Sequence, residues 1–132
     1  MKKNALPDSE QKRKLLFDNK APRERIISYG EILLREGRVN EAAELFTKAS
    51  HKEGLDQLKA LAVEEGDSFL YEVASKGSGE GGGQEAWVTL GKNAMEREKF
   101  SHAVRAFRKG ENAELLKAAE EALKEVVSVD KA

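Results

Sequence analysis

Apolar residues recur at helical spacing along most of the chain, in short stripes separated by polar or glycine-containing breaks. The clearest stripes lie between residues 87 and 107: Trp87, Leu90 and Ala94 form the first, and Phe100, Ala103, Val104 and Phe107 form the second. Residues three and four positions apart share one face of a helix. Two such helices joined by a short polar break predict an antiparallel helical hairpin.

The same order of residue types occurs earlier in the chain at one constant offset. The aligned pairs are Ile26 with Trp87, Tyr29 with Leu90, Gly30 with Gly91, Leu33 with Ala94, Val39 with Phe100, Ala42 with Ala103 and Phe46 with Phe107. These positions agree in character without a gap. We therefore interpret the chain as containing an internal duplication of one helical hairpin.

The hairpin pattern resembles the tetratricopeptide repeat, whose consensus is Trp-x2-Leu-Gly-x2-Tyr, then Ala-x3-Phe, then Pro. The residues that carry the resemblance are Trp87, Leu90, Gly91, Ala103 and Phe107. The resemblance implies an all-α fold, in which hairpins stack into a superhelix. A helical hairpin within a small bundle is the alternative. The closing proline of the consensus is missing, since Gly54 and Leu115 stand in its place.

We predict about seven or eight helices and no sheet, arranged as a single helical-repeat domain over residues 1–132. The predicted segments are an N-terminal helix over 8–19, a first repeat unit over 23–65, a connector helix over 67–76, a Gly-rich loop over 77–83 and a second repeat unit over 84–127. The predicted caps are Asp8, Asn40, Asp67 and Asn112, whose side chains can accept amides of the helices that follow. The predicted apolar anchors of the N-terminal helix are Leu15, Leu16 and Phe17.

Composition narrows the function classes. The formal net charge of −1 gives no basic field for nucleic acid, and the hydrophobic fraction of 39% suits a core rather than a membrane span. The absence of cysteine excludes disulfides and thiolate metal sites. No long apolar run follows the basic start of the chain, so we expect a cytoplasmic protein without a secretory signal.

Residues 77–83 contain a formal Gly-x-Gly-x-x-Gly match from Gly77 to Gly82. A dinucleotide site would need a strand before these glycines and a βαβ unit around them. A helix, not a strand, is predicted before these glycines, and the glycine run itself is not expected to be helical. The sequence therefore favours a flexible loop, and a nucleotide-linked regulator remains a remote alternative.

Candidate chemistry is sparse. His51 and His102 are the only histidines, and neither has a second metal ligand at a recognisable spacing. We therefore expect no catalytic residues, no metal, no cofactor and no enzymatic activity. A basic edge is predicted on one helix face; it comprises Arg97, Lys99, His102, Arg105, Arg108 and Lys109. It suits either an acidic partner or a solvated surface.

The resemblance implies a partner-binding groove lined by the first helix of each repeat. Carried over by alignment, the groove residues are Glu24, Ile27, Glu31, Leu34 and Arg35 in the first copy and Glu85, Val88, Lys92, Met95 and Glu96 in the second. Aliphatic groups among charges of both signs can hold an amphipathic helix or an extended peptide. The alternative is that adjacent helices cover the aliphatic positions.

The leading hypothesis is a non-catalytic adaptor that binds a peptide or helix of another protein. The alternative is a self-associating structural protein, a homodimer formed through the repeat faces. Relatives that clamp a C-terminal carboxylate use Lys and Asn in the groove. The matching positions here hold Ile27 and Val88, then Glu31 and Lys92, so that mode is disfavoured.

Overall fold

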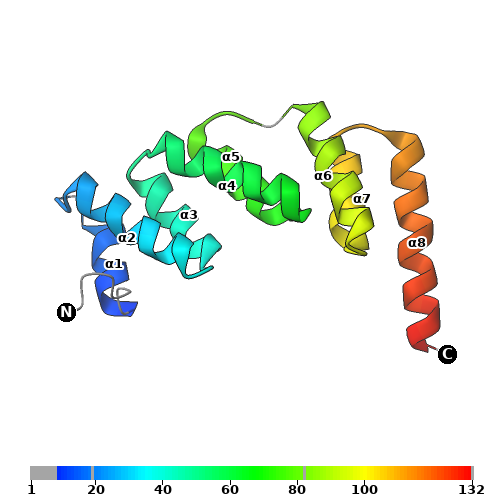
Figure 1. The fold of residues 1–132 in the computed structure, drawn as a ribbon, viewed down its shortest axis with the longest axis horizontal. Helices are drawn as coiled ribbons and strands as arrows, with labels where there is room; N and C mark the ends of the chain where they lie inside the picture. The colour runs from blue at the N-terminus through cyan, green and yellow to red at the C-terminus, as the bar shows by residue number, and fades with distance from the viewer. Residues whose placement is uncertain (1–8, 19, 82, 132) are drawn as a thin grey trace. The chain divides into compact units, whose positions relative to one another are not determined.

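The structure is a computed structural model that describes residues 9–18, 20–81 and 83–131. Its helices are α1 Ser9–Phe17, α2 Arg23–Arg35, α3 Val39–Lys48, α4 Lys52–Glu65, α5 Ser68–Ser78, α6 Gln84–Glu96, α7 Phe100–Lys109 and α8 Ala113–Lys131 (Figure 1). The described residues contain no strand. The prediction of an all-α chain with seven or eight helices is confirmed. The predicted cap Asp8 lies outside the described residues.

The chain divides into two compact units. Unit 1 consists of Met1–Leu58 and Val73–Glu80, and unit 2 consists of Lys59–Glu72 and Gly81–Ala132. The division falls within α4 and α5, so each of these helices contributes one part to each unit.

The core of unit 1 is built on the α2–α3 hairpin. Its buried side chains come from the apolar stripes of the two helices: Ile26, Ile32 and Leu33 from α2, and Ala42, Ala43, Leu45 and Phe46 from α3. Gly30 faces the Phe46 ring, and a Cβ on Gly30 would lie 2.5 Å from that ring. The glycine therefore lets the two helices approach closely.

The α6–α7 hairpin repeats this packing in unit 2. Gly91 faces the ring of Phe107 as Gly30 faces Phe46, again with no room for a Cβ. Trp87, the first residue of the apolar stripe of α6, is only 6% exposed. Its ring meets the Tyr71 ring of α5 edge to face, with centroids 4.7 Å apart, which is a favourable aromatic geometry.

The helix pairs α2–α3, α4–α5 and α6–α7 are joined by the same backbone turn. In each turn, the amide of the residue just before the second helix donates to the carbonyl five positions earlier in the first helix. The bonds are Arg38 to Leu33 at 2.9 Å, Asp67 to Ala62 at 2.9 Å and Lys99 to Ala94 at 2.8 Å. One residue per turn has a positive φ: Gly37 at 78°, Gly66 at 71° and Glu98 at 58°. This is the pattern of a Schellman motif, and it recurs between α3 and α4, where the His51 amide donates to Phe46 O at 2.8 Å, and between α7 and α8, where the Asn112 amide donates to Phe107 O at 3.1 Å.

Two of the predicted helix caps are confirmed. The Asp67 side chain accepts the Leu70 amide at 3.0 Å, and the Asn112 side chain accepts the Leu115 amide at 3.0 Å. Asn40 is not a cap, because α3 already begins at Val39 with Arg38 in the cap position. The Schellman bond made by the Arg38 amide ends the turn early, so the chain enters α3 before Asn40.

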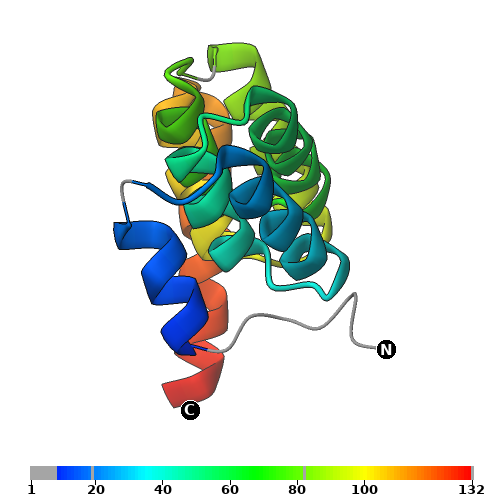
Figure 2. The same ribbon diagram turned by 90° about the vertical axis from the view of Figure 1, so that its left-hand side faces the viewer.

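Helix α1 runs beside α3 within unit 1 (Figure 2). Leu15 is buried there, but Leu16 is half-buried and Phe17 is 77% exposed. The prediction that all three residues anchor the helix is therefore wrong for Phe17 and only partly right for Leu16. Consecutive helix residues point about 100° apart, so three in a row cannot all face one neighbour.

Candidate functional site

The predicted groove residues of the first copy lie along α2. Glu24, Glu31 and Arg35 are exposed, whereas Ile27 and Leu34 are half-buried. The aliphatic pair lies two helical turns apart and is flanked by the three charges. This part of α2 therefore presents a narrow apolar strip with a charged border.

The predicted residues of the second copy show the same exposure at every aligned position of α6. Glu85, Lys92 and Glu96 are exposed, whereas Val88 and Met95 are half-buried. The two half-buried residues pack against the cluster of Ala94, Ala103, Phe107 and Ala119, and Val88 also lies close to Gly110. Val88 and Met95 therefore contribute to the core of unit 2, as the alternative of covering helices anticipated. The charged positions remain at the surface.

The predicted basic edge takes part in packing within unit 2. Arg105 and Lys109 of α7 both form ion pairs with Glu72 of α5, the second at 3.5 Å, and Arg108 lies 3.8 Å from Glu120 of α8. These cations therefore have carboxylate partners within unit 2, although the side chains of Arg108 and Lys109 remain 65% and 46% exposed. The carboxylates that pair with these cations lie on other helices, so the spacing of residues along α7 could not identify them.

Three donors, one in the last turn of α6 and two in the α6–α7 turn, satisfy carbonyls at the end of α4. Asn93 donates to Val63 O at 2.7 Å, Arg97 to Glu64 O at 3.2 Å and Lys99 to Glu65 O at 2.8 Å. The last carbonyls of a helix have no partner within it, and cations near them are favoured by the helix dipole. Arg97 and Lys99, two members of the predicted basic edge, thus join α4 to the following hairpin.

His102 has a structural partner at the start of α5. The Ser68 amide donates to His102 Nδ1 at 3.0 Å, and the Ser68 hydroxyl oxygen lies 2.9 Å from the same nitrogen. Nδ1 accepts the amide proton only when it carries none itself. The ring also meets Phe69 edge to face at 5.4 Å. In the part of the chain that the structure describes, no three His, Asp or Glu side chains gather as a metal ion would require.

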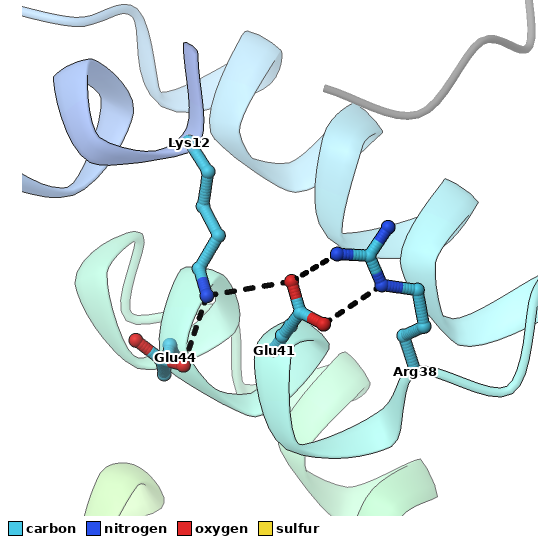
Figure 3. Close-up of polar contacts among 4 residues, drawn as sticks. All are labelled: Lys12, Arg38, Glu41 and Glu44. Carbon is cyan, nitrogen blue, oxygen red and sulfur yellow. Dashed lines mark hydrogen bonds and ion pairs between the residues drawn. The ribbon is translucent and has the colours of Figure 1, made fainter. Parts of the chain in front are cut away.

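A cluster of four charged residues joins α1 to α3 (Figure 3). Lys12 Nζ lies 3.4 Å from Glu41 and 3.3 Å from Glu44, while Arg38 Nε donates to Glu41 at 2.7 Å. The hydrogen bond from Arg38 holds the pKa of Glu41 below its ordinary value; burial opposes this shift, and the nearby Lys12 charge adds to it. The same hydrogen bond raises the pKa of Arg38. The cluster fixes α1 against α3 by charge.

The Gly-rich segment is shorter than the sequence predicted. Helix α5 continues through Gly77 and Ser78, although no helix was expected to include them. A Cβ on Gly77 would overlap the Thr47 hydroxyl and lie 3.2 Å from Leu55, so Gly77 is where α5 packs against α3 and α4. Packing offsets the poor helix propensity of glycine at this position. Gly82, the last residue of the formal Gly-x-Gly-x-x-Gly match, lies outside the described residues.

The structure contains two open apolar hollows that the sequence did not predict. One, of about 520 Å³, lies in unit 1 and is lined by Leu16, Phe17, Glu44, Thr47, Val73, Lys76 and Gly77. The other, of about 500 Å³, lies in unit 2 between α7 and α8. The sequence signal for the first was the run of apolar residues at 15–17, which one helix face cannot bury.

No protein-family model, curated protein or solved structure matches this chain. None of the helices in the described residues combines the length and apolarity that crossing a membrane requires. The fold class and the exposure of the side chains are therefore the observations on which a function can be argued.

Proposed function

We propose that the chain is a non-catalytic protein-interaction scaffold of the tetratricopeptide-repeat type, which binds a peptide or helix of a partner protein on the outer faces of α2 and α6. One observation carries the proposal. At five aligned positions the two copies have the same exposure, with charged residues outside and aliphatic residues half-buried. The exposed charges at these positions are available to a partner segment, and the half-buried aliphatic residues of α2 add apolar surface beside them.

The chemistry of these faces indicates the kind of partner segment. On α2, Ile27 and Leu34 supply an apolar strip, Glu24 and Glu31 supply negative charge, and Arg35 supplies positive charge. An amphipathic segment could place apolar side chains on the strip and charged ones along its border. The charges differ between the copies, because Lys92 stands where Glu31 stands and Glu96 stands where Arg35 stands. The two faces therefore select different charges on the partner.

A charge-reversal experiment tests the proposal without touching the core. The test variant combines Glu31→Lys with Lys92→Glu, both at exposed positions. The matched control combines Asn40→Lys with Ser101→Glu, at aligned exposed positions near the starts of α3 and α7. Both variants keep the net charge of the parent chain. The full-length proteins are affinity-purified from the source cells, and co-purifying proteins are quantified together with the melting temperature of each variant.

The proposal predicts that a discrete partner is lost from the Glu31/Lys92 variant and kept by the Asn40/Ser101 control, with both melting temperatures near that of the parent. Equal retention of every co-purifying protein by the two variants would contradict it. Loss from the control alone would place the binding surface on the second helices and would contradict it equally.

A further inference from the structure

The second half of α8 extends beyond the helix against which it packs (Figure 1). Helix α8 has 19 residues and α7 has 10, so α8 is about 28 Å long and α7 about 15 Å. Ala119, near the middle of α8, is fully buried against the α6–α7 hairpin. Farther along, Val126 and Val127 are each 43% exposed. Apolar side chains thus continue along α8 beyond the part that packs against the α6–α7 hairpin.

This exposed part of α8 borders the hollow of about 500 Å³ in unit 2. The lining residues are Val104 and Arg108 from α7 and Glu120, Leu123, Lys124, Val127 and Ser128 from α8. The α8 members are spaced three and four apart, so they form one face of that helix. The floor is aliphatic and the edges carry charges of both signs.

The place of the hollow in the series of helices indicates what kind of element would fill it. Both α2 and α6 are followed by a second helix that packs against them and returns in the opposite direction. In the described residues, α8 has no such second helix, and the hollow lies between α8 and α7, the last second helix of the series. This is the position in which one further antiparallel helix would lie.

We propose that this helix is α8 of a second copy of the chain, so that the protein forms a two-fold symmetric dimer through α8. An interface of this symmetry must be complementary to itself. Glu120 and Lys124 meet the requirement, because they lie one turn apart on the same edge of the hollow. An antiparallel copy, with the two-fold axis passing between these positions, places each Glu120 beside Lys124 of the other chain. Leu123 then lies close to the axis.

The charge pattern favours α8 over α1 as the helix that enters. Helix α1 carries Lys12, Arg13 and Lys14 in succession. The hollow is bordered by two cations, Arg108 and Lys124, and its one carboxylate, Glu120, already lies 3.8 Å from Arg108, so a basic helix would meet mainly like charge. Helix α8 brings its own Glu120 to one of these cations.

The contact is expected to be reversible. One pair of helix faces buries less surface than the roughly 1,200 Å² at which stable interfaces begin. The dimer should therefore dissociate on dilution. This inference does not depend on the proposed partner-binding faces, which lie on α2 and α6 and are tested separately.

Sedimentation velocity of the full-length protein over a range of micromolar concentrations tests the dimer. The informative variants are Glu120→Lys and Lys124→Glu. Each alone places like charges across the two-fold axis, whereas an equimolar mixture of the two places opposite charges at both contacts. Glu125→Lys, at an exposed α8 residue outside the hollow, is the control for a charge change on the same helix. Circular dichroism verifies that each variant is helical.

We expect the parent chain and Glu125→Lys to shift from monomer to dimer as concentration rises. The dissociation constant of each hollow variant alone should rise by about tenfold or more, since each loses a charged contact and gains a repulsion. The mixture should recover most of the association. A parent chain that stays monomeric throughout would overturn the proposal. So would a dimer that the two variants leave unchanged, or a mixture that associates no better than its components.

Discussion

Gly91 packs against the ring of Phe107 so closely that a Cβ on Gly91 would overlap the ring. The first copy repeats the contact between Gly30 and Phe46. Gly91→Ala should therefore destabilise unit 2 by about 1–3 kcal/mol, because the buried ring must move to admit the methyl group. This sign opposes the helix propensity of alanine, which favours Gly→Ala by about 1 kcal/mol at an unconstrained helical site.

Chemical denaturation followed by the fluorescence of Trp87, the single tryptophan, measures this change in unit 2. Gly81→Ala is the matched control, since a Cβ there meets nothing within 4 Å. Its free energy of unfolding should stay near that of the parent. A Gly91→Ala protein as stable as the control would show that the close approach of α6 and α7 does not constrain this position.

The hairpin turns offer a reciprocal pair of substitutions. Gly37 and Glu98 occupy aligned positions and both have positive φ, at 78° and 58°. A residue with a Cβ is strained in that conformation by about 1 kcal/mol, whereas glycine is not. Gly37→Glu should therefore lower the free energy of unfolding by about 1 kcal/mol, and Glu98→Gly should raise it by a similar amount.

Because a Cβ on Gly37 meets nothing within 4 Å, its substitution tests the backbone alone. Differential scanning calorimetry of the two variants and the parent provides the measurement. If both substitutions shifted the melting temperature in the same direction, the shared turn would not explain their effects.

The Gly-rich segment should differ in tolerance along its length. Inserting Gly-Ser between Gly81 and Gly82 should change the free energy of unfolding by only a few tenths of a kcal/mol, because a longer flexible loop costs little closure entropy. Gly77→Ala should instead cost about 1–3 kcal/mol, since its Cβ would overlap Thr47. Thermal melts of both variants would establish the contrast, and a large loss on insertion would show that the loop has a structural role.

The stability contribution of the α1–α3 charge cluster should depend on pH. The pKa of Glu41 is lowered in the folded chain, so its carboxylate stabilises the fold at neutral pH. That contribution is lost as pH falls below about 4, through the lowered pKa, where the carboxyl is protonated in both states. Glu41→Gln should therefore be less stable than the parent at neutral pH and should match it in acid.

The comparison uses denaturant unfolding of the two proteins at a series of pH values. Glu53→Gln, at an exposed position on α4, controls for the loss of one carboxylate without this partner network. A Glu41→Gln defect of the same size in acid and at neutral pH would mean that the charge of Glu41 is not what stabilises the contact.

Local periodicity was sufficient to predict the helices and the duplicated hairpin. The stripe containing Trp87 and Leu90 needs only a 3.6-residue period, and the alignment of Gly30 with Gly91 needs only a constant offset. Capping by Asp67 and Asn112 was predictable for the same reason, since a cap and its amide are neighbours in sequence.

The features that the sequence did not predict depend on contacts between segments that are distant along the chain. Gly77 lies in α5 where that helix packs against Thr47 and Leu55, and helix propensity, which depends on neighbouring residues only, does not take such contacts into account. The pairing of Arg105 with Glu72 of α5 gave one member of the predicted basic edge an ion-pair partner that its own helix could not reveal. For the groove, sequence identified the surface charges of α2 and α6, but it could not decide between an open strip and a packed one. Met95 is half-buried because it packs against a cluster to which α7 and α8 contribute.

Site-specific photocrosslinking tests the proposed scaffold most directly. A photoreactive residue is placed at Glu31 or Lys92 on the first helices, and at the aligned positions Asn40 or Ser101 on the second helices, in the full-length chain in its source cells. All four positions are exposed. The account predicts that Glu31 and Lys92 capture the same discrete partner and that Asn40 and Ser101 do not. Capture of that partner only from Asn40 and Ser101, equal capture from all four positions, or no crosslink from Glu31 and Lys92 would contradict it.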